Sequence, residues 1–444
     1  MQIKSLTLTQ FRAFEQVTFE FQPGMNLLVG INGVGKSSVL DALRIALSRV
    51  LPNFTAYQDK RLNFEVDDIM MGRDQLAVKI KFQAFDIPFI CNVTRGKSHK
   101  VEFKPDNENI LYPLKNADEQ PLVVYFSTRR SVPVEKVLNK KNSAGNQSAA
   151  FAEALIHRML RLREFAEWWL VQDALLGEDR TLAKQRLEIM KNVVIKFLTG
   201  CTSLSAAPQP KKVSYFCILA ILNGFKNLAI SLIWVMKWDD SQLKTKTTLI
   251  LDKDGVTINV TQLSDGERGL LALVLDLARR LCQANPNLED PLENGKAVVL
   301  IDEIDLHLHP RWQRTIVDQL TQTFPNCQFI ATTHSPLIIG EVKPPGLTLI
   351  RKEDNGIVLL EKGLQGFGLA SNWILEELMG TKSRNATTQA QINLVEDALE
   401  EGELELARNR LEQLKDMIQG YDGEVVRLEA SINNLEALAE DVDI

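Results

Sequence analysis

The first part of the chain alternates between polar and apolar residues over several short stretches, which predicts β-strands. Residues 1–30 read as two strands, ending in the apolar run 25–29 before a glycine. Apolar residues then recur at helical spacing from 38 to 50, so a helix is expected directly after a glycine loop. Residues 76–104 alternate again, like the strands of a sheet, and residues 123–126 form another short strand.

The middle of the chain changes from strand to helix periodicity and back. Helical spacing from Phe151 onward indicates a helical insertion over about residues 131–230. Strand character returns at 247–260, where the turn 252–255 separates two apolar runs. A long helix is expected from 265 to 282.

Two further strands are expected at 297–301 and 328–332, and they flank a helix that starts near Pro310. A strand, a helix and a second strand in this order are typical of a parallel sheet covered by helices. The pattern therefore predicts an α/β fold, a mixed sheet flanked by helices. Its four expected segments are residues 1–130, 131–230, 231–370 and 371–444.

The last segment is predicted to be mostly helical from Ser371 onward. Gly420 and Gly423 separate two helices that each carry one apolar stripe, so we expect an antiparallel hairpin that packs against itself or a partner. The segment is rich in Glu and Asp. A solvated helix face explains this charge better than an acidic docking site. The stripes are Leu404, Ala407, Leu411, Leu414 and Ile418, then Val425, Leu428, Ile432 and Leu435.

Composition and charge then exclude several classes of protein. With 45% hydrophobic and 24% charged residues among 444, the chain is a folded globular protein. A net charge of -6 gives no overall basic field, so any contact with nucleic acid must be local. The five scattered cysteines show no metal-ligand spacing and suit reduced thiols in the cytosol.

Membrane insertion is not expected. The start of the chain lacks the apolar block of a signal peptide. Residues 215–238 are long enough to span a bilayer, but Asn223, Lys226 and Asn227 interrupt them. A buried helix followed by a strand is therefore preferred, and the protein is predicted to be cytoplasmic.

Residues 30–37, GINGVGKS, lie between an apolar strand and a helix and match the phosphate-binding P-loop pattern. Glycines in this pattern let backbone N–H groups surround a phosphate, and the following helix N-terminus adds positive potential. Lys36 is expected to reach the β- and γ-phosphates of ATP, and the Ser37 hydroxyl to ligate Mg²⁺. The glycines are Gly30, Gly33 and Gly35.

A second motif places two adjacent carboxylates at the end of a buried strand. Residues 297–303, AVVLIDE, deliver Asp302 and Glu303. Two acids in this position are commonly solvent-exposed residues without a chemical role. Next to a P-loop, however, Asp302 is expected to hold Mg²⁺ through water and Glu303 to polarise the attacking water.

The third motif is LSDGER, residues 263–268, directly before the long helix. By itself it is a good helix cap, with Ser264 or Asp265 as the N-cap and Glu267 nearby. Whether this cap binds phosphate depends on which other motifs the chain contains.

Taken together, the P-loop, LSDGER, FRAF at 11–14, IDEIDLHLHP at 301–310 and TTHSP at 332–336 resemble the SMC, RecF and OLD group of ABC-type ATPases. The resemblance implies an ABC-type head whose sites are completed when two copies meet. It also implies γ-phosphate contact by His334 and D-loop rather than metal-ligand roles for His307 and His309. The nucleotide-binding set then includes Asn32 and Ser38, with Ser264, Gly266 and Asp305 acting in trans.

The sequence departs from this group at the Q-loop. Gln75 and Gln83 are candidates by position only, and residues 125–129 could replace that function. The long coiled coil of SMC proteins and the nuclease domain of OLD proteins have no counterpart in the pattern.

The short insertion, a helix with Trp168 and Trp169, and the acidic tail most resemble PtuA-type ATPases of Septu or retron-associated anti-phage systems. That resemblance implies a homo-oligomeric ATPase that regulates a separate HNH-type nuclease. Two alternatives stay open: a RecF-like DNA repair ATPase, and a nucleotide-binding scaffold with little turnover. For DNA contact the local basic candidates are Arg95, Lys97, Lys100, Lys104, Lys140 and Lys141, which equally fit an exposed hairpin and loop.

Overall fold

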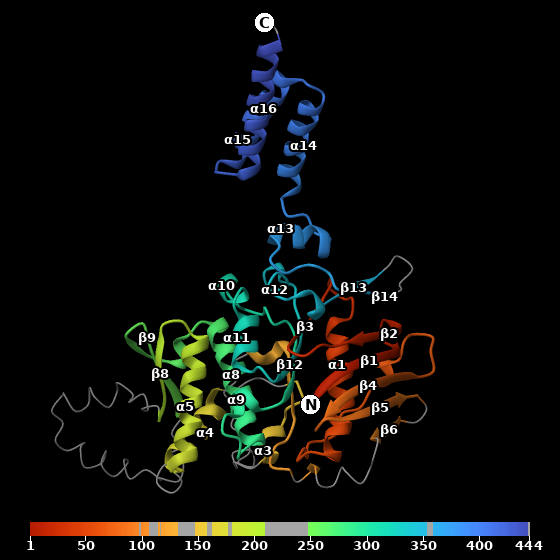
Figure 1. Ribbon diagram of the computed structural model, residues 1–444, viewed down its shortest axis with the longest axis vertical. Helices are drawn as coiled ribbons and strands as arrows, with labels where there is room; N and C mark the ends of the chain where they lie inside the picture. The colour runs from red at the N-terminus through yellow and green to blue at the C-terminus, as the bar shows by residue number, and fades with distance from the viewer. Residues whose placement is uncertain are drawn as a thin grey trace, which may run out of the picture. The chain divides into compact units, whose positions relative to one another are not determined.

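The computed structural model divides into two compact units, Met1–Gly368 and Leu369–Ile444 (Figure 1). Each unit is considered separately below. The residues that the structure describes are 1–96, 99–105, 114–115, 117–131, 147–157, 162–175, 180–208, 247–352 and 358–442.

A six-stranded sheet forms the centre of the first unit, in the order β14-β13-β3-β12-β11-β7. All neighbouring strands are parallel except the edge strand β14, which is antiparallel to β13. Every residue of β3, β7, β11 and β12 is buried, which explains why these strands are mostly apolar; their buried polar residues are Asn26, Gln328 and Thr332, together with the Tyr125 hydroxyl. The bounds are β3 Met25–Val29, β7 Leu122–Phe126, β11 Ala297–Ile301, β12 Cys327–Thr332, β13 Leu347–Lys352 and β14 Val358–Lys362.

A second, antiparallel sheet has the order β2-β1-β4-β5-β6. The helix α1, Lys36–Val50, contacts β4 and β5 of this sheet and β11 and β12 of the central sheet, so it lies between them (Figure 1). The expectation of two strands in residues 1–30 is wrong, because there are three. Arg12, at φ 50°, turns the chain tightly between β1 and β2, and so short a turn leaves the alternation almost unbroken. The bounds are β1 Gln2–Phe11, β2 Phe14–Glu20, β4 Leu76–Ala84, β5 Ile87–Arg95 and β6 His99–Pro105.

Helices and a small sheet complete the first unit. The antiparallel sheet β10-β9-β8 contains the predicted hairpin, and β8 lies within the segment 131–230, which therefore supplies a strand as well as helices. The apolar stretch 215–238 lies outside the described residues. The bounds are β8 Cys201–Pro208, β9 Thr247–Lys253, β10 Val256–Asn259, α3 Gln147–Phe151, α4 Leu162–Leu175, α5 Arg180–Phe197, α8 Asp265–Ala284, α9 Pro291–Asn294, α10 Pro310–Gln313, α11 Ile316–Thr323 and α12 Pro336–Ile339.

The second unit is a bundle of three helices rather than a hairpin of two. Helix α14 packs with α15 and α16 around one apolar cluster, so the expected hairpin has a third member. The unit starts with α13 and a short π-helical turn. The bounds are α13 Ser371–Trp373, α14 Ala386–Glu400, α15 Leu404–Ile418 and α16 Gly423–Val442, and the cluster comprises Ile392, Val395, Ala398, Ala407, Leu411, Leu414, Val425, Leu428 and Ile432.

Within the described part of the chain, no helix combines the length and the apolar character needed to cross a bilayer.

Candidate active site

The candidate site lies at the carboxyl ends of the central strands. The P-loop follows β3, Asp302 and Glu303 follow β11, and His334 follows β12. These strands are parallel neighbours, so their carboxyl ends meet at one edge of the sheet. The P-loop at residues 30–37 is thus brought together with two segments near residues 302 and 334, far along the chain.

Two P-loop glycines are required by close backbone and ring contacts. A Cβ on Gly30 would lie 2.4 Å from the Ile350 carbonyl oxygen, and one on Gly35 would lie 2.7 Å from Cζ of Phe14. Both have positive φ, 154° and 109°, where L side chains are strained. The sequence pattern predicts glycine here for the phosphate, and the fold adds a packing reason.

Lys36 lies buried inside the loop that precedes it. Its Nζ donates hydrogen bonds to the carbonyl oxygens of Gly30 at 2.7 Å and Ile31 at 3.0 Å. Burial lowers the pKa of Lys36 to about 8, although the carboxylates of Asp302, Glu303 and Asp305 favour the charged form. The ammonium is therefore held in place by the two carbonyl oxygens, and its burial outweighs the three carboxylates.

Asp302 connects the P-loop to the central sheet. Its Oδ1 accepts hydrogen bonds from the hydroxyls of Ser37 at 2.9 Å and Thr332 at 2.8 Å. The Thr332 hydroxyl oxygen also accepts the backbone N–H of Glu303 at 2.8 Å, where the chain takes a positive φ of 49°. Thr332 belongs to the TTHSP string, but no role was predicted for it. The only further signal was a hydroxyl residue at the end of a mostly apolar strand.

Asp305 is tied to the histidine loop of its own chain. Its Oδ1 accepts a hydrogen bond from the Thr333 hydroxyl at 2.5 Å and another from the His334 backbone N–H at 3.3 Å. Burial and the charge on Lys36 lower the pKa of His334, so its ring is neutral at neutral pH. The structure brings the predicted residues Asp305 and His334 into contact, and the expected contact of Asp305 in trans remains a proposal.

The LSDGER segment caps α8, as the sequence predicts, and Ser264 is the N-cap. The Ser264 hydroxyl donates to Glu267 Oε2 at 2.8 Å, and the Glu267 backbone N–H donates back to it at 3.3 Å. Ser264 itself is exposed. Gly266 abuts the D-loop, since a Cβ there would lie 2.2 Å from the His307 carbonyl oxygen. The helix turn that carries Ser264 therefore packs against the segment that contains His307.

An arginine network on the first turns of α1 was not predicted. Arg12 donates to the hydroxyl of Ser38 at 3.1 Å and to Asp41 at 2.9 Å, and Arg44 also pairs with Asp41 at 2.7 Å. Arg44 reaches His157 Nε2 at 2.7 Å, which links this helix to the segment after α3. Only the FRAF string pointed to Arg12. The other members depend on tertiary contacts.

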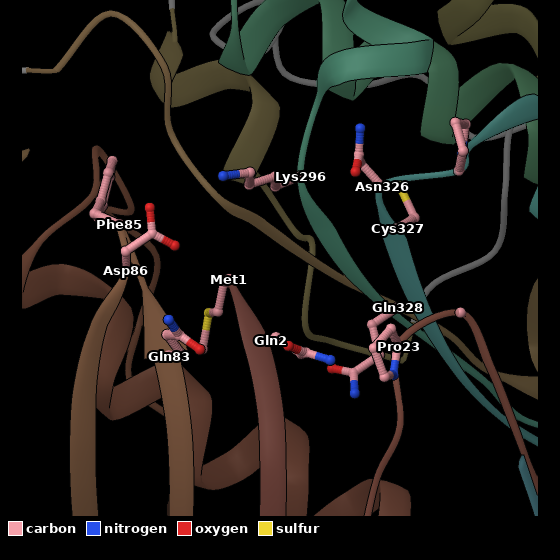
Figure 2. Close-up of a pocket in the computed structure, with 12 residues that line it drawn as sticks. Met1, Gln2, Pro23, Gln83, Phe85, Asp86, Lys296, Asn326, Cys327 and Gln328 are labelled. Atoms are coloured by element: carbon pink, nitrogen blue, oxygen red, sulfur yellow. The ribbon is translucent and has the colours of Figure 1, made fainter. Parts of the chain in front are cut away.

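The Q-loop candidates are separated by the fold. Gln83 lines a pocket of about 200 Å³ with Met1, Lys296 and Cys327, at the amino-terminal ends of β11 and β12 (Figure 2). This is the edge opposite the P-loop, so Gln83 is not part of the site. Ser127, by contrast, is buried directly after β7, beside the bond of 2.8 Å from the Asp302 N–H to the Phe126 carbonyl oxygen.

A metal site built from His, Cys, Asp and Glu side chains alone does not occur among the described residues. His309 instead caps α10, where its Nδ1 accepts the Arg311 N–H at 3.2 Å. A Mg²⁺ site of the nucleotide type needs fewer protein ligands. The Ser37 hydroxyl and the Asp302 carboxylate, in contact at the P-loop, supply the oxygen donors that this ion prefers.

A mixed sheet with a P-loop, a buried aspartate and a histidine loop at one edge, together with a capped LSDGER helix, defines a nucleotide-binding ATPase head of the ABC type. Comparison with known protein families then identifies the family of this chain. The family described as "AAA domain, putative AbiEii toxin, Type IV TA system" matches residues 25–340, and the chain belongs to this family.

Individual relatives agree with the resemblance that the sequence predicts. The protein named Retron Vc95 probable ATPase, from Vibrio cholerae serotype O1 biovar El Tor, is 27% identical over 83% of this chain and 77% of its own length. Septu protein PtuA of Bacillus thuringiensis is 22% identical over 85% of this chain and 84% of its own length. A solved SMC head bound to the C-winged helix domain of ScpA covers 82% of this chain and 98% of that chain at 14% identity, with a TM-score of 0.47. The predicted likeness to retron-associated and PtuA-type ATPases is confirmed.

Proposed function

We propose that this chain is a cytoplasmic ATPase whose heads pair on ATP and whose nucleotide state controls a separate nuclease in anti-phage defence. The contact of 2.9 Å between Ser37 Oγ and Asp302 Oδ1 carries the first part of this proposal. It joins the phosphate-binding loop to the acidic strand end, and ATP hydrolysis requires these two parts to act on the same phosphates.

Each residue at the sheet edge has a role that its position supports. Lys36 and the P-loop N–H groups bind the β- and γ-phosphates. Ser37 and Asp302 would hold Mg²⁺, which when bound spreads negative charge away from the phosphate oxygens. Glu303, one residue beyond Asp302, orients and accepts a proton from the attacking water, and a neutral His334 donates a hydrogen bond to the γ-phosphate.

The second half of each site comes from the other copy. Ser264 is exposed at the N-terminus of the 20-residue helix α8, where backbone N–H groups favour an anion. In the paired state, Ser264 and Gly266 of one head would contact the γ-phosphate held by the other head, with Asp305 at the same interface. Bound ATP then stabilises the paired heads, and hydrolysis allows them to separate.

The proposed control of a nuclease is supported by the similarity to named relatives. Proteins named as retron ATPases and as Septu PtuA are similar over more than four fifths of this chain. The resemblance to PtuA-type ATPases implies a separate HNH-type nuclease, so we propose that such a partner docks on the segment 131–230 or on the tail unit. A RecF-like role in DNA repair is the competing function.

One experiment tests both levels of the proposal. The purified chain and its Glu303→Gln variant are incubated with Mg-ATP, and turnover and self-association are measured with and without an HNH-type nuclease or duplex DNA. We expect the wild type to turn over ATP and the variant to accumulate as ATP-bound pairs. Equal, near-zero turnover in both proteins would instead indicate a scaffold. Stimulation by DNA without any response to the nuclease would favour repair.

A further inference from the structure

The charge around the exposed Ser264 poses a problem for phosphate binding. Two carboxylates, those of Asp265 and Glu267, lie within three residues of this serine. A γ-phosphate that approaches Ser264 brings further negative charge, and charges within a few ångströms repel strongly near a protein surface. The site therefore needs a compensating cation for each carboxylate.

Each of the two carboxylates has one. Asp265, whose side chain is 66% exposed, pairs with Arg268 on the next turn of α8. Glu267 is only 11% exposed and pairs through Oε1 with Lys253, which belongs to β9 rather than to α8. The Glu267 partner is thus supplied by a different element of the fold.

Glu267 also determines how Ser264 is held. Its Oε2 accepts the Ser264 backbone N–H at 3.0 Å and the Ser264 hydroxyl at 2.8 Å, while Lys253 occupies Oε1. Burial favours the neutral carboxyl, but the hydrogen bonds from Lys253 and Ser264 prevail, and the pKa of Glu267 lies below its ordinary value. The carboxylate is ionised and fixed at both oxygens.

We propose that Lys253 is a positioning residue for the shared ATP site: it neutralises and holds the Glu267 carboxylate, so that the γ-phosphate held by a second copy of this chain can approach Ser264 and replace Glu267 Oε2 as the acceptor of the Ser264 hydroxyl. The inference rests on the proposed pairing of heads. It adds a residue outside every motif recognised in the sequence. Strand β9, which carries Lys253, also contacts α4. The segment 131–230 is therefore connected through β9 and Lys253 to the ATP site.

The test compares full-length variants of matched size. Lys253→Met removes the charge and keeps the length of the side chain, and Lys253→Arg keeps the charge. Lys79→Met is the control, at an exposed position of β4 in the five-stranded antiparallel sheet. We expect Lys253→Met to weaken ATP-dependent self-association by about tenfold, since a partly buried charge loses its partner. The affinity of the unpaired chain for ATP should change less than about twofold. Lys253→Arg and Lys79→Met should pair like the wild type.

A merely structural ion pair is distinguished by the Glu267→Gln background. If Lys253 acts by neutralising Glu267, adding Lys253→Met to Glu267→Gln should cost no further self-association. An equal loss in both backgrounds, or normal pairing by Lys253→Met alone, would overturn the inference. If Lys253→Met alone unfolds the head, the comparison of Glu267→Gln with the double variant still decides, because the double variant contains no unpaired charge.

Failure of the inference and failure of the shared site give different results. Ser264→Arg is measured alongside, and it should abolish ATP-dependent pairing while sparing ATP binding. Normal pairing by Ser264→Arg would show that the shared site itself is wrong. Lost pairing by Ser264→Arg with normal pairing by Lys253→Met would remove only the role of Lys253.

Discussion

The Lys36 ammonium shows how one residue couples charge to ligand binding. Its side chain is 6% exposed, and burial lowers its pKa to about 8, in spite of three nearby carboxylates. A triphosphate that contacts this nitrogen favours the charged form. ATP binding and protonation of Lys36 are therefore linked.

This linkage predicts a pH dependence with a definite sign. Below pH 8 Lys36 is already charged, and ATP affinity should be nearly constant. Above pH 8 the free chain loses the proton that the complex needs, so affinity should fall by up to about tenfold per pH unit. Titration calorimetry in buffers of different ionisation enthalpy measures both the affinity and the proton uptake. An affinity that rises between pH 8 and 9 would contradict the placement of Lys36 at the phosphates.

The packing of Gly30 makes a second prediction at the residue scale. Gly30→Ala should lower the free energy of unfolding by at least about 3 kcal/mol, because its Cβ would meet the backbone oxygen of Ile350, which cannot move aside cheaply. Gly24→Ala is the matched control. Its φ of 74° is also left-handed, but nothing lies within 4 Å, so it should cost only about 1 kcal/mol. Urea unfolding of both variants compares them, and equal costs would refute the packing role.

The sequence predicts those site residues whose spacing is set by a local motif, and the structure places them at one edge of the central sheet. The P-loop glycines, Lys36 and Asp302 belong to motifs because a phosphate imposes fixed spacing on the chain. The hydrogen bonds of Thr332 and the Arg44 to His157 contact could not be predicted in this way. They arise where distant segments meet, and a single sequence contains no signal for such contacts.

At the scale of elements, the tail unit should unfold separately from the ATP site if its core is weakened. Leu411 is fully buried in the cluster between α14, α15 and α16. Leu411→Ala should cost the tail about 2 to 4 kcal/mol, and ATP affinity should stay unchanged. Hydrogen exchange of the three helices measures the loss. Leu406→Ala, at a position of α15 that is 37% exposed, is the control and should leave exchange nearly as in the wild type.

Elements with a strong hydrophobic pattern were predicted well, including the short buried strands β3, β7 and β11, and elements with a weak pattern were not. Helix α8 carries its own cap and is buried over most of its length, so pattern and structure agree. In α14 only three residues are buried, which is too sparse a stripe to identify it as a partner of the later helices. The turn between β1 and β2 was missed because it interrupts the alternation for only two residues.

For the whole molecule, the charge is distributed unevenly. Residues 369–444 contain 17 acidic and six basic residues, a net charge of -11, while the whole chain carries -6. Residues 1–368 therefore carry +5. The overall acidity argues against nucleic acid only for the tail, because the head has a slightly basic balance of its own.

The central claim is that one ATP site is built from two chains, and mixing two inactive variants tests it most directly. Lys36→Ala lacks a working P-loop but keeps Ser264, whereas Ser264→Arg lacks the serine but keeps the P-loop. Each variant alone should hydrolyse almost no ATP. An equal mixture should recover about a quarter of the wild-type rate, because half of randomly formed dimers contain one intact site out of two. A mixture as inactive as its components, or a Ser264→Arg protein that is fully active alone, would contradict the account.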